Sequence, residues 1–228
     1  MVKKEIIDDW QERFPILSSY TPSTLYMKVD IVLWGLRIDK IFSKEYRILF
    51  ECLPLWEDSV QKRNIPVFYT ELWGKNGTQF FIDYASHDKL FQSASDFAEK
   101  QFGLFFHPEV TVSDVWKWLD QLSSSLIPKH NPINLYRIFE FKLALALFFN
   151  DRSLMDKAKK EVDKEIRHWD VLHFQKLFSK SPDEWRAELY AKFGNRDSFI
   201  RSVDSNMNDK RIIRLKEAHF CTSVFPKI

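Results

Sequence analysis

The chain has 228 residues, with 34 Lys and Arg against 32 Asp and Glu, so its formal net charge is only +2. This near neutrality argues against a protein whose whole surface attracts nucleic acid. The 45% hydrophobic and 29% charged content is ordinary for a globular protein and excludes disorder of the whole chain. We expect one domain over residues 1–228, with a sheet-containing part at 1–105 and a helical part at 106–228 as the fallback.

Cysteine usage and hydropathy indicate where the protein resides. The chain has only two cysteines, Cys52 and Cys221, and this low count suits a reducing compartment. Its first residues mix lysines with acidic residues and lack the apolar core of a secretion signal. The most apolar run, 141–149, contains Lys142 and is too short to span a bilayer. We therefore expect a soluble, cytoplasmic protein without a membrane partner.

The first elements follow from hydrophobic spacing. Apolar residues at helical spacing predict an amphipathic helix over residues 3–14, which Pro15 ends. Residues 18–23 are expected to form a loop. Strict alternation then predicts a strand over 25–33, with a bulge or strand end at Trp34–Gly35.

Further strands follow. A second strand is predicted over 46–52, and Pro54 stops it. Residues 67–73 and 78–84 are rich in aromatic and β-branched residues and flank a Gly- and Asn-rich turn at 74–77, which predicts a β-hairpin. The short connections favour antiparallel pairing, so we expect a small antiparallel sheet of about four strands.

From residue 86 onward the pattern is helical. The helix that ends at Gly103 and the one over 133–149 are the clearest, and the second is apolar on almost every face, as in a helix covered on all sides. The expected helices are 90–102, 115–122, 133–149, 153–169, 170–179, 182–193, 197–205 and 208–218. The expected helix starts are Thr111 with Asp114, Asn131–Pro132, Ser153 with Asp156, and Ser181 to Glu184. The fold class is α+β, with the N-terminal sheet packed on a mainly helical C-terminal part.

Phosphate-binding and nucleophile motifs are missing. The chain has five glycines, and only Gly74 and Gly77 are close together, so it has neither a dinucleotide-binding nor a P-loop pattern. It also lacks the GxSxG nucleophile elbow. We expect no cofactor.

Histidines and cysteines do not cluster in the manner of a metal or thiol site. His168 and His173 are five residues apart, which suits neither face of a continuous helix, and His219 with Cys221 supplies only two ligands. Cys52 continues an apolar strand face, as an inert core cysteine does. We expect neither metal binding nor nucleophilic catalysis by cysteine.

Glu140 is the candidate acid or base, because it lies in the most apolar helix. An apolar setting can raise a carboxyl pKa into the range of acid–base catalysis. Arg137, three residues earlier, favours a structural ion pair instead. An enzyme with a site assembled from Glu140, Arg137, His168 and His173 is one alternative function, and three of these side chains in one pocket would favour it.

The C-terminal part has the clearest charge bias, a net +4 over residues 151–228. Lys210, Arg211, Arg214 and Lys216, with Arg196 and Arg201, could form a basic stripe on the helix expected at 208–218. Nucleic-acid binding through this helix is a second alternative. Interspersed acidic residues favour a solvated helix face, so we expect no nucleic-acid partner.

Aromatic residues are the most conspicuous feature, with 21 Phe, 8 Trp and 7 Tyr. Most follow the buried periodicity and predict a packed core. Trp34, Trp56, Trp73 and Trp116 lie near strand ends or a helix start, and exposed Trp and Arg are typical of protein-binding hot spots. The candidate binding residues are these four tryptophans with Lys210, Arg211 and Arg214.

The missing catalytic motifs and these tryptophans together favour one function. We expect a non-catalytic, cytoplasmic protein-interaction domain, of the inhibitor or immunity type or a regulatory binding protein, whose partner is another protein.

Overall fold

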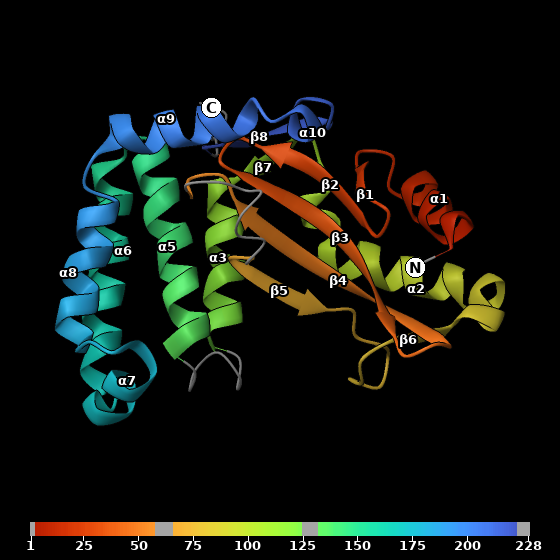
Figure 1. Ribbon diagram of the computed structural model, residues 1–228, viewed down its shortest axis with the longest axis horizontal. Helices are drawn as coiled ribbons and strands as arrows, with labels where there is room; N and C mark the ends of the chain where they lie inside the picture. Colours follow the sequence, from red (N-terminus) through yellow and green to blue (C-terminus); the bar gives the residue numbers. More distant parts are fainter. Residues whose placement is uncertain (1–2, 58–65, 125–131, 223–228) are drawn as a thin grey trace, which may run out of the picture.

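The protein has an α+β fold in which strands and helices segregate along the chain, as expected. The computed structural model describes residues 3–57, 66–124 and 132–222. N-terminal strands form a curled half-barrel sheet, and the C-terminal part is mainly helical (Figure 1). Figure 1 shows α3 beside the sheet, then α5, then α6 and α8, with α9 crossing their ends.

The sheet is larger than expected and mixed. Its strands are β1 (Ser18–Thr21), β2 (Thr24–Val29), β3 (Val32–Ile41), β4 (Glu45–Pro54), β5 (Phe68–Glu71), β6 (Phe81–Asp83), β7 (Glu109–Thr111) and β8 (Glu217–Cys221). Their order is β5-β4-β3-β2-β8-β7, with β1 also on β2 and β6 also on β4. β8 pairs in parallel with both β2 and β7. The prediction of a purely antiparallel sheet is therefore corrected by a strand that returns from the helical part.

The strand expected at 25–33 is a hairpin of two strands. β2 ends at Val29 and β3 begins at Val32, with Asp30 at φ 45° in the turn, a conformation that Asp tolerates. β3 then passes Gly35 without a break in register, so the bulge or strand end expected there was wrong. Ile31 and Leu33 are both fully buried, so the apolar alternation continues through the turn. The pattern therefore could not reveal where one strand ends and the next begins.

Of the hairpin expected at 67–84, the turn forms, but the two strands do not pair mainly with each other. The chain reverses through residues 74–77, where the Gly77 N–H donates to the Gly74 carbonyl and Trp73 bridges Gln79. The ladders of β5 and β6, however, both run along β4.

Three short strands were not foreseen. The loop expected at 18–23 contains β1, which pairs with β2, and β7 and β8 interrupt the helical part. Strands of three to five residues show too little periodicity for recognition from sequence.

The helices agree well with the expected positions. They are α1 (Lys4–Arg13), α2 (His87–Phe102), α3 (Val112–Ser124), α5 (Pro132–Phe148), α6 (Arg152–Glu165), α7 (Val171–Phe178), α8 (Pro182–Lys192), α9 (Arg196–Met207) and α10 (Lys210–Ile213), with 3₁₀ turns η1 (Tyr84–Ser86), η2 (Gly103–Phe105) and η3 (Ile166–His168). The helix expected at 208–218 was wrong, because only the four residues of α10 are helical before β8 begins. No helix in the described ranges has both the length and the apolar composition needed to cross a membrane.

The predicted helix starts divide into confirmed and corrected cases. The Ser181–Glu184 capping box is present, and the Asp114 N–H donates to Thr111 Oγ1 at 3.1 Å. The cap of α6 is Asp151, which accepts from the Leu154 N–H, and not Ser153 with Asp156. Asn131 lies outside the described residues.

The core lies between the sheet and the helices. Phe50 of β4 stacks on Phe105 at 4.7 Å and on Phe102 at 5.2 Å, which joins the sheet to η2 and the end of α2. The covered position expected for the apolar helix is confirmed, because α5 buries even Lys142, whose side chain is 2% exposed. Burial of this size supplies the main stabilisation of the fold.

Candidate functional site

Three of the four candidate tryptophans are buried. Trp34 is 0% exposed and contacts Phe105 and Phe220, Trp56 packs on Phe141 and Phe199, and Trp116 donates to Glu161 at 3.3 Å. Trp34 and Trp116 lie inside β3 and α3, and side chains from distant elements cover all three rings. Only Trp73 is exposed, at 41%. The expected surface of four tryptophans therefore does not form.

Trp73 belongs to a group of exposed side chains that the sequence did not single out. We call the sheet side that carries Phe50 the inner face and the side that carries Glu51 the outer face. Tyr69 lies opposite Glu51, and Glu71 lies opposite Leu49, so both are on the outer face. Trp73 lies two residues beyond the end of β5, and the same alternation continued past Leu72, which is fully buried, places it on this side. Tyr69, Glu71 and Trp73 form what we call the β5 stripe.

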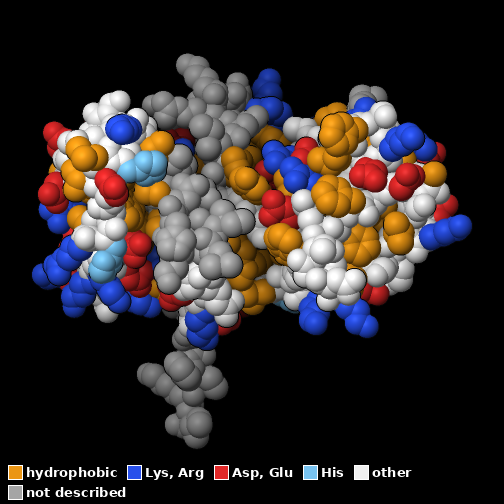
Figure 2. All heavy atoms as spheres, turned by 90° about the horizontal axis from the view of Figure 1, so that it is seen from below, with side chains coloured by type: hydrophobic (Ala, Val, Ile, Leu, Met, Phe, Trp, Pro, Cys, Tyr) orange, Lys and Arg blue, Asp and Glu red, His pale blue; other side chains and the backbone are white. Residues whose placement is uncertain are grey.

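The β5 stripe is accessible and has an aromatic neighbour. Tyr69 is 53% and Phe81 43% exposed, and Phe81 lies opposite Arg47 on the same face of β4. Figure 2, seen from below, shows hydrophobic side chains gathered around a small group of acidic and basic ones on the sheet half of the molecule. Within the described ranges, the Glu71 carboxylate makes no hydrogen bond or ion pair. Local alternation around 67–73 was the signal that could have identified this stripe.

A polar cluster lies under this surface. The Tyr26 hydroxyl donates to Glu51, and Arg37 lies 3.4 Å from the other Glu51 oxygen. Burial raises the pKa of Glu51, although its contacts with Tyr26 and Arg37 oppose the shift. The cluster ties β2, β3 and β4 together on the outer face.

The four residues of the predicted assembled enzyme site separate into two places. His168 and His173 line a cavity among the helices, whereas Arg137 and Glu140 lie in an ion cluster with Glu57. No three of them share a pocket, so the geometry expected to favour an enzyme is not met.

The ion cluster explains how the Glu140 carboxylate is accommodated in an apolar helix. This carboxylate accepts from Arg137 and from Lys192, both at 2.7 Å. Burial by itself lowers the pKa of Lys192, but Glu140 and Glu57 outweigh this effect and the pKa is raised. Both cations therefore stay charged, and the cluster joins the segment after β4 to α5 and α8. The predicted structural pair of Arg137 and Glu140 is confirmed, whereas Glu57 and Lys192 were not foreseen.

The basic residues of the C-terminal part do not lie on one helix. Arg211 pairs with Asp209 and lies over the Tyr20 ring, Arg196 donates to the last carbonyls of α5, and Lys216 donates to the Pro15 carbonyl. Lys210, Arg214 and Arg201 are exposed. The stripe expected for nucleic-acid binding is therefore interrupted by structural contacts.

The thiols and imidazoles show no metal or nucleophile geometry in the described ranges. Cys52 is fully buried, and burial raises the pKa of its thiol well above the usual value, as in the inert core cysteine expected. No group of three or more potential metal ligands occurs among the described residues. The buried His87, which the sequence did not mark, bridges Tyr46 at 2.7 Å and Asp9 at 2.8 Å and fastens α1 and α2 to β4.

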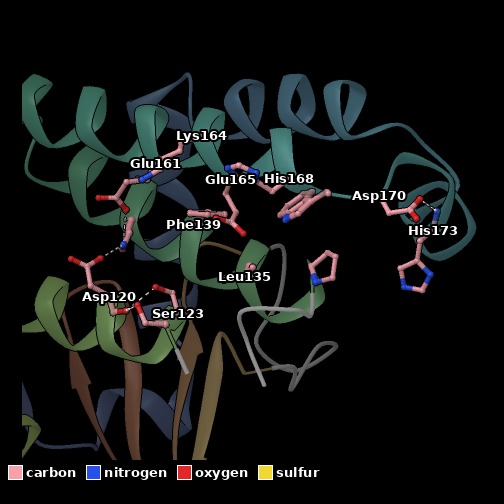
Figure 3. A pocket seen from close by; sticks show the side chains of 14 residues that line it. Asp120, Ser123, Leu135, Phe139, Glu161, Lys164, Glu165, His168, Asp170 and His173 are labelled. Carbon is pink, nitrogen blue, oxygen red and sulfur yellow. Dashed lines mark hydrogen bonds and ion pairs between the residues drawn. The ribbon is translucent and has the colours of Figure 1, made fainter. Parts of the chain in front are cut away.

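A cavity lies in the helical part. Its volume is about 770 Å³, and α3, α5, α6 and the start of α7 surround it (Figure 3). Figure 3 shows Asp120 and Glu161 at one end, Phe139 and Leu135 in the middle, and Asp170 and His173 at the other end.

Comparisons with known proteins give no family for this arrangement. No family model, curated protein or solved structure matches the chain. The functional argument therefore depends on the site geometry alone.

Proposed function

We propose that the chain is a non-catalytic protein-interaction domain whose partner binds the β5 stripe and Phe81. One observation carries this proposal: three aromatic side chains, each more than two-fifths exposed, share one sheet face with a carboxylate that makes no ion pair within the described residues. Aromatic side chains of this kind dominate the binding energy of protein interfaces.

The stripe also indicates the chemistry of the partner. Glu71, the last residue of β5, lies between Tyr69 and Trp73 in the extended chain, about 7 Å along the chain from each. A lysine or arginine of the partner would pair with this carboxylate and lie against one of the two rings. The partner is therefore a protein that presents a basic side chain flanked by apolar ones, and an inhibitor or immunity role fits such a contact.

Other observations bear on the cellular compartment and on the two alternative functions. Both cysteines are free, which supports the reducing, cytoplasmic compartment expected from the sequence. The enzyme alternative loses support because its four residues separate, and the nucleic-acid alternative because α10 has only four residues.

Site-specific photo-crosslinking in the native host tests this function. Benzoylphenylalanine replaces Tyr69 in one variant and Leu172, a 71% exposed residue of α7 in the helical part, in the control variant. We expect one partner protein to crosslink from position 69 and not from position 172. In binding assays with that partner, Trp73→Ala is expected to weaken binding about 30-fold, as a hot-spot residue would.

Charge variants distinguish the stripe from a general apolar surface. Glu71→Lys is expected to abolish binding, while Glu12→Lys on α1 leaves it unchanged. Equal crosslinking from both positions, or crosslinking only to a second copy of this chain, would overturn the proposal. So would a Glu71→Lys variant that binds the partner normally.

A further inference from the structure

The cavity among the helices has the size of a small-molecule site. Its volume of about 770 Å³ falls within the range that ligand pockets occupy, from about 300 to 1,000 Å³. Side chains from α3, α5, α6 and α7 line it, so the cavity belongs to a packed helical scaffold. It lies apart from the β5 stripe, because its lining residues come from the helical part, whereas the stripe lies on the outer face of the sheet (Figure 1).

The end of the cavity at α3 is acidic despite a lysine. Lys142 is 2% exposed, and its ammonium lies 2.5 Å from both Asp120 and Glu161. Two carboxylates thus neutralise one ammonium, and one negative charge remains. The Asp120 side chain is 49% exposed, so part of that charge is accessible from the cavity.

The rest of the lining increases this surplus. Glu165 and Asp170 add two carboxylates, and Lys164 adds one ammonium. With His168 and His173 counted as neutral, four carboxylates and two lysines give the described residues of the lining a net charge of −2. A surplus of this sign in a concave, partly apolar site attracts cations.

The middle of the cavity is apolar and aromatic. Leu135 and Phe139 come from the buried helix α5, and Trp169, which stacks on Phe174 at 5.0 Å, follows η3. These rings give the cavity a flat apolar surface on which the body of a ligand can lie.

We infer that this cavity binds a small organic ammonium compound with a flat apolar body. The ammonium group pairs with the Glu165 carboxylate, and the apolar body lies against Phe139 and Trp169. This ligand class differs from the protein partner proposed for the β5 stripe.

Three probes with the same ring but different charge test the ligand class. Isothermal titration calorimetry compares tyramine, a cation, with the neutral 4-hydroxyphenylethanol and the anionic 4-hydroxyphenylacetate. We expect saturable binding of tyramine, with the neutral probe about tenfold weaker and the anion weaker still. Equal affinities for tyramine and 4-hydroxyphenylacetate, or no saturable binding of tyramine, would overturn the inference.

Matched variants place the binding in this cavity. Ser123→Lys introduces a cation at the lining and should abolish tyramine binding, and Glu165→Gln should weaken it about fivefold. Ser202→Lys on α9 and Glu12→Gln on α1 are the controls and should leave the affinity unchanged. Circular dichroism verifies that each variant is folded. Tyramine affinity that is the same in Ser123→Lys and Ser202→Lys contradicts the assignment.

Discussion

The inner face of the sheet buries its aromatic residues, whereas the outer face exposes those of β5 and β6. On the inner face, Phe50 stacks on Phe102 and Phe105, with all three rings buried. On the outer face, Tyr69 and Phe81 are exposed although they lie on strands that pair with the same β4. An aromatic residue in a strand is therefore informative only once the side on which the helices pack is known.

The largest expected effect concerns the inner face. Phe50→Ala should reduce the free energy of unfolding by about 3–5 kcal/mol, because a large ring is removed from a close-packed core. Phe81→Ala, the matched change on the outer face, should cost less than about 1 kcal/mol. Urea denaturation of both variants checks this difference, and equal losses would show that the two faces are not distinct in packing.

A smaller effect is expected where the outer face permits no side chain. A Cβ at position 35 would overlap the backbone carbonyl oxygen of Leu25. Gly35→Ala should therefore destabilise the protein by about 1–3 kcal/mol through displacement of β2 from β3. Gly77→Ala is a useful comparison, because no atom lies near its added Cβ and only its positive φ is strained. A Gly35→Ala variant as stable as the wild type would contradict the close approach of these strands.

The β5 stripe should separate binding from stability. The double change Tyr69→Ala and Trp73→Ala is expected to alter the free energy of unfolding by less than about 1 kcal/mol in total, because both residues are about half exposed and neither packs against the hydrophobic core. Thermal and urea denaturation measure the stability, and the crosslinked partner reports the binding. A loss of several kcal/mol would identify the stripe as part of the core instead.

The smallest effect is a pH dependence at Glu51. Its pKa is raised in the folded protein by burial, so folding favours the protonated form. The stability of the wild type relative to Glu51→Gln should therefore fall as the pH rises from the ordinary pKa of Glu through the raised one. Urea denaturation of both proteins at acidic and neutral pH measures this difference. A difference that grows in the opposite direction would show that Arg37 and Tyr26 outweigh burial.

The sequence by itself determined the class of fold, most helix positions and the burial of α5. These properties depend on local periodicity and capping, as Ser181 with Glu184 illustrates. It also indicated the Arg137–Glu140 ion pair, because residues three apart meet on a helix.

Only the tertiary structure decided which aromatic residues reach the surface and which charges meet. The local sequence pattern could not assign Trp34 and Trp56 to the core or to the surface. Both are buried because Phe220 and Phe199, from elements far away in sequence, pack against them. The return of β8 to β2 and the convergence of Asp120 and Glu161 on Lys142 likewise join segments that are far apart in sequence. Periodicity records which side of an element is apolar, whereas exposure and site geometry depend on what other elements pack against it.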